Sequence, residues 1–102
     1  MKTLIITLFL FLITPLVCLA DDFQIFIGHG SQRIRADYAV VTMTDGNNQI
    51  VINNKYADAY GRIKLDARLG SYVCKVVHKG KTYTVRISID GNAHLKGLII
   101  NP

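Results

Sequence analysis

Apolar and polar residues alternate through most of the chain after its first twenty residues. Ile63 and Leu65 stand between charged residues, and the segment 82–90 alternates over its whole length. A period of two places successive side chains on opposite faces of a β-strand. No segment of this part keeps a helical period over more than a turn or two. The pattern therefore predicts an all-β protein.

Turn residues divide the alternating pattern into about seven short strands at spacings near 8 to 12 residues, as in β-sandwiches. The segment GHGSQ has the glycine content of a loop, Asp45-Gly46-Asn47-Asn48 is a turn cluster, and HKGK closes a hairpin. We expect strands near residues 23–27, 37–44, 49–54, 62–66, 72–77, 82–90 and 93–100. The predicted fold is a small Greek-key β-sandwich forming a single domain, residues 21–102.

The first twenty residues have the three-part plan of a secretory signal peptide. Lys2 precedes an apolar run that ends near Pro15, and the small residue Ala20 follows. The run is shorter than the roughly 20 residues of a membrane span, so we expect no transmembrane span after cleavage at Ala20. Cys18 lacks the small preceding residue of a lipoprotein processing site. We predict a periplasmic or secreted protein, and the choice between the two stays open.

Cleavage after Ala20 leaves one small domain that is basic and poor in cysteine. Only Lys2 is lost from the twelve Lys and Arg residues, while all seven acidic residues remain, and each is an aspartate. A positive net charge favours anionic partners and also keeps small proteins soluble. Cys74 is the only cysteine that remains, so no disulfide forms within the domain. We expect it to be a small buried hydrophobe; pairing with another chain is the alternative.

The segment Leu69 to Val76, LGSYVCKV, is similar to a late strand of an immunoglobulin domain, in which a tyrosine precedes one disulfide cysteine. The upstream cysteine and the tryptophan of that domain are both missing. A longer window, residues 54–90, resembles the carboxypeptidase regulatory-like, or transthyretin-like, β-sandwich domains. The residues that carry the resemblance are Asp58, Gly61, Arg62, Ile63, Leu65, Gly70, Tyr72 and Val76, and upstream the segment RADYAVVTMTDG.

This resemblance implies a scaffold in which Asp58 and Gly61 form a turn, Gly70 permits a bend, and Tyr72 and Cys74 point inward. Leu69 stands where the family usually has proline, and Cys74 where leucine or valine is usual. The expected core-facing residues are Ile63, Leu65, Tyr72, Cys74, Val76, Val85 and Ile87. A scaffold of this kind does not by itself define a function.

The chain lacks the residue patterns of the common catalytic and metal sites. It has no glutamate, so the glutamate base of the carboxypeptidases is not carried over, and it has no His-Glu-x-x-His arrangement. His29, His78 and His94 have no close chelating spacing. We therefore expect no catalytic residue, no metal, no cofactor and no enzymatic activity.

Basic residues suggest one binding hypothesis. Arg62 and Lys64 alternate outward on one expected strand, Lys75 lies on the next, and three more surround the following hairpin: Lys79, Lys81 and Arg86. If these strands are neighbours, the residues form a patch for an anionic envelope polymer or an acidic protein. Nucleic acid is not an expected partner after export, because no aromatic stacking motif accompanies these residues.

Two functions follow from these features. The first is an exported noncatalytic module that acts as a binding or structural accessory of the cell envelope or secreted fraction. The alternative is a small inhibitor or polyanion-binding factor that uses GHGSQRIR or the HKGK hairpin. The identity of the partner and the oligomeric state stay open.

Overall fold

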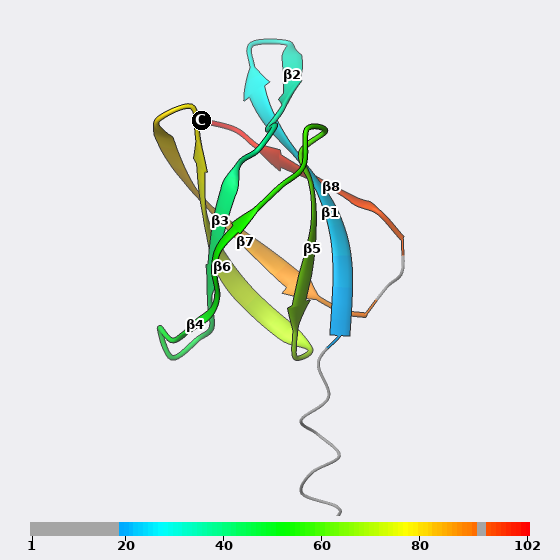
Figure 1. The fold of residues 1–102 in the computed structure, drawn as a ribbon, viewed down its shortest axis with the longest axis vertical. Helices are drawn as coiled ribbons and strands as arrows, with labels where there is room; N and C mark the ends of the chain where they lie inside the picture. The colour runs from blue at the N-terminus through cyan, green and yellow to red at the C-terminus, as the bar shows by residue number, and fades with distance from the viewer. Residues whose placement is uncertain (1–18, 92–93) are drawn as a thin grey trace, which may run out of the picture.

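The computed structural model describes residues 19–91 and 94–102, and within them it contains strands and no helix (Figure 1). The all-β prediction is therefore confirmed. The eight strands are β1 (Leu19–His29), β2 (Gln32–Arg35), β3 (Val40–Thr44), β4 (Ile50–Tyr56), β5 (Arg62–Ala67), β6 (Gly70–His78), β7 (Lys81–Ile89) and β8 (Lys96–Ile100).

The strands form two sheets that pack on each other around one core. Sheet A contains β1, β2, β5 and β8, and sheet B has the order β4-β3-β6-β7. All pairs are antiparallel except β1 and β8, which run parallel. Buried side chains from both sheets belong to one cluster, so the arrangement is sandwich-like.

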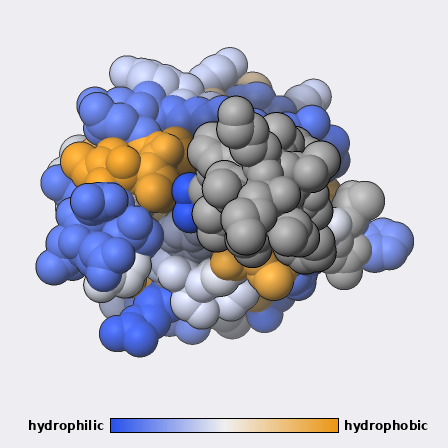
Figure 2. Space-filling model, turned by 90° about the horizontal axis from the view of Figure 1, so that it is seen from below, coloured by the Kyte–Doolittle hydropathy of each residue, from blue (hydrophilic) through white to orange (hydrophobic). Residues whose placement is uncertain are grey.

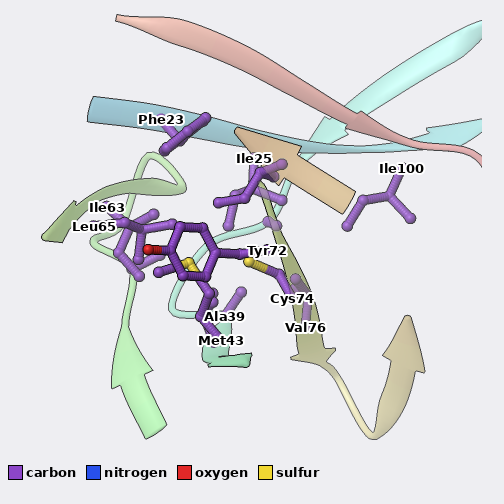
Figure 3. Close-up of a cluster of buried hydrophobic side chains, with 14 of the residues drawn as sticks. Phe23, Ile25, Ala39, Met43, Ile63, Leu65, Tyr72, Cys74, Val76 and Ile100 are labelled. Carbon is purple, nitrogen blue, oxygen red and sulfur yellow. The ribbon is translucent and has the colours of Figure 1, made fainter. Parts of the chain in front are cut away.

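The core contains the inward-facing residues of the alternating strands. Figure 3 shows Phe23 and Ile25 of β1 facing the side chains of Met43, Tyr72 and Cys74. The predicted core residues Ile63, Leu65, Tyr72, Cys74, Val76 and Ile87 are buried, and Val85 is partly buried against them. Removing this apolar surface from water is the main favourable term in folding, and burial alternates with a period of two along β1, β3, β5, β6 and β7.

Two motif residues on β6 have the inward positions that we predicted. The Tyr72 hydroxyl donates a hydrogen bond to the Arg68 carbonyl at 2.7 Å, a link back to the bend before its own strand. Cys74 is a free thiol with no exposed surface, and burial raises its pKa to about 12. The prediction of a small buried hydrophobe is confirmed.

The structure differs from the prediction at several strand boundaries. Residues 32–35, which we did not assign to a strand, form β2, so the described part of the chain has eight strands instead of about seven. The expected strand at residue 37 begins only at Val40, because Tyr38 has a φ of +54° and Ala39 donates to the Ala36 carbonyl in a turn. β8 begins at Lys96, and His94 and Leu95 before it are not in a strand; Ala93, the expected start, lies outside the described residues.

Most of the predicted signal peptide, residues 1–18 including Cys18, lies outside the described residues. Leu19 and Ala20, the last two residues of that segment, belong to β1 and pair with β5. Within residues 19–91 and 94–102, no helix is long and apolar enough to cross a membrane.

The end of the molecule that carries the β3–β4 and β5–β6 turns has a mainly polar surface among the described residues (Figure 2). Apolar areas interrupt it, and the exposed apolar side chains of these two turns include Ile50 and Leu69. Single exposed apolar side chains are normal on soluble proteins, so these two side chains do not by themselves indicate a binding site.

Candidate functional site

The strand arrangement around β1 brings two distant segments of the chain into line. β5 pairs with residues 19–24 of β1, and β2 pairs with residues 26–29. β8 pairs with residues 23–27, a range that overlaps both the β1 residues paired with β5 and those paired with β2. Because a strand has only two edges, β5 and β2 must share the edge of β1 that β8 does not use. They lie along it end to end.

This arrangement places four basic residues beside the outward-facing positions of β1. The register partners of Asp22, Gln24, Phe26 and Gly28 are Lys64, Arg62, Arg35 and Arg33, in that order. Directly opposite residues of an antiparallel pair have their side chains on the same face of the sheet. The four basic side chains are all exposed, and we call them the cationic row.

The spacing of the cationic row follows from strand geometry. Alternate residues of a strand are about 7 Å apart, and the row runs beside residues 22–28 of β1, a length of about 20 Å. On the other side of β1, Ile99 of β8 is the register partner of Phe26 and is partly exposed. The row therefore lies beside a narrow apolar strip on the outer face of sheet A.

Tyr60 occupies the junction between the two halves of the cationic row. The guanidinium carbons of Arg35 and Arg62 lie 5.5 Å and 5.8 Å from the centre of its ring. The ring is 54% exposed, and the side-chain amide of Gln24 donates to the Tyr60 carbonyl at 3.0 Å. Both distances are within the range of cation–π attraction, so one aromatic ring joins the two arginines.

The turn before β5 holds Tyr60 and Arg62 in place. The Asp58 carboxylate accepts hydrogen bonds from the backbone N–H groups of Tyr60 at 2.8 Å and Arg62 at 2.9 Å. The Gly61 N–H donates to the Asp58 carbonyl at 3.0 Å. These contacts confirm the predicted turn from Asp58 to Gly61. Hydrogen bonding from the Arg62 N–H lowers the pKa of Asp58 below its ordinary value.

Gly61 allows the close approach that joins the two halves. Its φ is +78°, and a β-carbon there would lie 2.8 Å from the Ile25 carbonyl oxygen. The Ile25 N–H donates to the Gly61 carbonyl at 2.8 Å, while the Ile25 carbonyl accepts from the Ala36 N–H at 2.9 Å. Ile25 thus bonds to the residue before β5 and to the residue after β2, and only glycine fits at the crossing.

The charges of the cationic row are not neutralised by ion pairs. Among the described residues, no ion pair involves any of its four members. Asp22 and Asp58 line a shallow hollow together with Arg62 and Lys64. β2 itself, with the sequence QRIR, has no acidic residue. The positive charge is therefore least balanced at the Arg33 end.

The six residues of the predicted patch are not on one face. β5 pairs with β1, whereas β6 pairs with β3 and β7, so the strands of the patch are not all neighbours. Arg62 and Lys64 belong to the cationic row. Lys75 and Arg86 lie on the outer face of sheet B, and the β6–β7 hairpin carries Lys79 and Lys81.

Sequence reasoning missed Arg33, Arg35 and Tyr60 as partners of Arg62 and Lys64. The alternation of QRIR after a glycine turn was the one local signal for β2. Nothing local indicates that β2 continues the line of β5, because this depends on which edge of β1 each strand occupies.

The described residues offer binding groups in place of a metal centre. Within them, no group of three or more His, Cys or Asp side chains is placed to hold a metal ion. Guanidinium groups are well suited to carboxylates, sulfates and phosphates because their N–H donors form a planar fork. The cationic row can therefore bind anions arranged in a line.

Comparison of the chain with models of known protein families gives no match, and comparison with curated proteins gives none.

Proposed function

We propose that this protein is an exported, noncatalytic binding module that holds an extended anionic partner on the cationic row. It would act as an accessory of the cell envelope or secreted fraction. The observation that carries the proposal is the line of four exposed cations, which form no ion pair among the described residues and of which Arg35 and Arg62 contact Tyr60. The carboxypeptidase regulatory-like scaffold and Greek-key connectivity remain predictions.

An extended partner fits the cationic row better than a compact one. The cations recur about every 7 Å over about 20 Å, so a small ion would contact one or two of them. An acidic chain or anionic polysaccharide could contact all four at once. Each exposed contact is weak, typically about 0.2–1 kcal/mol, and several acting together would be needed for measurable affinity.

The test compares two double variants with the same loss of charge. Arg35→Gln/Arg62→Gln removes the centre of the cationic row, and Lys75→Gln/Arg86→Gln removes two cations from the outer face of sheet B. Binding of labelled dextran sulfate and of poly-L-glutamate to the exported protein is measured by fluorescence polarisation at low and physiological ionic strength.

We expect the first variant to bind about tenfold more weakly, a change of about 1.4 kcal/mol, and the second to bind as the wild type does. Wild-type affinity should fall as salt rises, because exposed charges are screened. Equal weakening by both variants would show that only net charge matters and would overturn the proposal.

A second candidate function, assembly by strand addition, is favoured by the edge of sheet B. β7 pairs over nine consecutive residues with β6, and no strand of residues 19–91 and 94–102 is hydrogen-bonded to its other side. The opposite edge strand, β4, has register shifts that disturb its pairing. Regular edges can accept another strand. Pull-down from the exported fraction separates the two functions: capture that survives high salt and the Arg35→Gln/Arg62→Gln change supports strand addition.

A further inference from the structure

A second concave site lies between two hairpins at one end of the molecule. The β1–β2 and β6–β7 hairpins are at the same end in Figure 1. Between them is a cleft of about 250 Å³, and its lining residues are Ile27, His29, Ile34, His78, Lys79, Lys81 and Tyr83. We call it the hairpin cleft. It shares no lining residue with the cationic row.

The hairpin cleft is an opening of the space between the two sheets. On β1 the inward positions run from Ile25 and Ile27, which are buried, to His29, which is exposed. On β7 they run from Val85 through Tyr83 to the exposed Lys81. On both β1 and β7, therefore, the inward-facing side chains change from apolar to basic toward the end of the molecule that carries the two hairpins.

The inner part of the hairpin cleft is apolar. Ile27 and Ile34 are register partners in the β1–β2 hairpin, and Tyr83 of β7 lines the same cleft. Ile34 is 43% exposed although its neighbour Ile27 is buried. An apolar ligand group placed here would cover Ile34 and gain the burial of its own surface.

The outer part of the hairpin cleft is basic, and none of the described residues that line it is acidic. Asp37, which does not line the cleft, is hydrogen-bonded to His78, with 2.9 Å between Oδ1 and Nε2. This hydrogen bond is the main reason that the pKa of Asp37 is lowered, and Lys79 contributes more weakly. Lys81 and His29 lie at the same rim, and no ion pair involves either of them among the described residues.

The turns hold the two rims in fixed positions. Lys79 and Gly80 have φ values of +49° and +77° and lie between the paired residues His78 and Lys81. Positive φ at both central residues is typical of the type I′ hairpin turn. Gly30 has a φ of +64° at the first central position of the other hairpin, whose closing pair is His29 and Gln32. The two turns thus keep the basic groups at the opening.

We propose that the hairpin cleft binds a small amphipathic carboxylate, with its apolar or aromatic body inside and its carboxylate at the opening. Ile27, Ile34 and Tyr83 contact the body, and Lys79 and Lys81 bind the carboxylate. The volume is below the roughly 300–1,000 Å³ of sites for drug-sized ligands, so the ligand is about the size of an arylalkanoic acid.

The experiment titrates phenylacetate into the exported protein and follows backbone amide shifts by NMR. Phenylacetamide has the same body without the charge, and acetate has the charge without the body. We expect phenylacetate to shift amides of residues 27–34 and 78–83 and to bind at least about fivefold more tightly than either comparison ligand. Equal binding of phenylacetamide or acetate, or shifts confined to other strands, would overturn the proposal.

Variants separate the carboxylate contact from loss of folding. Lys79→Gln/Lys81→Gln should weaken phenylacetate binding about tenfold, a typical effect of losing charge-assisted hydrogen bonds. Ile34→Ser, at an exposed position, should weaken phenylacetate and phenylacetamide alike. Arg35→Gln/Arg62→Gln should leave phenylacetate binding unchanged, which distinguishes this site from the cationic row. Unchanged affinity in the lysine variant, with wild-type amide shifts elsewhere, contradicts the assignment.

Discussion

The outer faces of the two sheets are built from similar alternating strands but differ in how they arrange their charges. On sheet A, four cations follow one another along a single edge of β1. On sheet B, Lys75 is the register partner of Thr42 and Thr84, and Arg86 is the register partner of Val73. Thus the register partners of the two sheet B cations are uncharged.

The difference comes from strand order. β6 and β7 pair with each other over nine residues, so no third strand shares the edge at which they meet. β5 and β2 are shorter, and they divide one edge of β1 between them. The comparison teaches that a line of charge can be assembled from two separate segments when they share an edge. Gly61 lies where β5 and β2 meet along this edge, so the alignment of the four cations depends on it.

Substitution at Gly61 should have the largest effect on this comparison. Gly61→Ala places a β-carbon 2.8 Å from the Ile25 carbonyl oxygen at a φ of +78°. We expect a loss of about 3 kcal/mol or more in the free energy of unfolding, because backbone must move and the residue is strained. Urea unfolding followed by circular dichroism measures the loss.

Gly30→Ala is the matched control for this change. Gly30 also has a positive φ, +64°, but a β-carbon there has no neighbour within 4 Å. The expected loss is about 1 kcal/mol, from the backbone conformation alone. If the two variants lose equal stability, the crossing at Ile25 is not the constraint that we describe.

Local alternation was enough to predict the inward-facing residues of β6 and β7. Tyr72, Cys74 and Val76 are buried as predicted because their burial depends only on which face of β6 meets the core. The turn at Asp58 was also predictable, because it needs only local groups: the Asp58 carboxylate accepts from the Tyr60 N–H, and the Gly61 N–H donates to the Asp58 carbonyl.

The cationic row could not be predicted in the same way. β2 has only four residues and none of them is buried, so it has no buried alternation to identify it. The alignment of Arg35 with Arg62 requires β2 and β5 to occupy the same edge of β1. Edge choice is decided by long-range packing, and the period of a strand contains no information about it.

The buried thiol on β6 gives the second-largest expected effect, and it tests the core that both sheets share. Cys74→Ser places a hydroxyl where the described structure provides only apolar surroundings, and we expect a loss of about 2 kcal/mol. Cys74→Ala keeps the site apolar and should cost less, about 1 kcal/mol. Urea unfolding of both variants measures the difference; a serine variant as stable as the alanine variant would show that the site admits a polar group.

Acidification should weaken the turn on sheet A through Asp58. Its pKa lies below the ordinary value of 3.8 because the folded carboxylate accepts backbone hydrogen bonds. The stabilisation is therefore fully present above pH 3.8 and is lost as the pH falls through the lower, folded pKa. Asp58→Asn removes this titration, so its unfolding free energy should fall less steeply below pH 4 than that of the wild type. Asp37→Asn is the comparison variant, because the hydrogen bond from His78 gives Asp37 a lowered pKa as well. If Asp58→Asn leaves the pH dependence of the unfolding free energy below pH 4 unchanged, the loss of stability in acid comes from other groups.

The smallest expected effect on stability comes from the cationic row itself. Arg35→Gln/Arg62→Gln removes two exposed cation–π contacts with Tyr60, each worth about 0.5–1 kcal/mol at exposed sites. It also removes the repulsion among four aligned cations, which offsets part of that loss. We expect the free energy of unfolding to change by no more than about 0.5 kcal/mol, as for most surface substitutions. Binding of an anionic polymer should nevertheless weaken. A loss of stability as large as that of Gly61→Ala would mean that the arginines and Tyr60 hold β2 against β5, and that their alignment serves the fold instead of a partner.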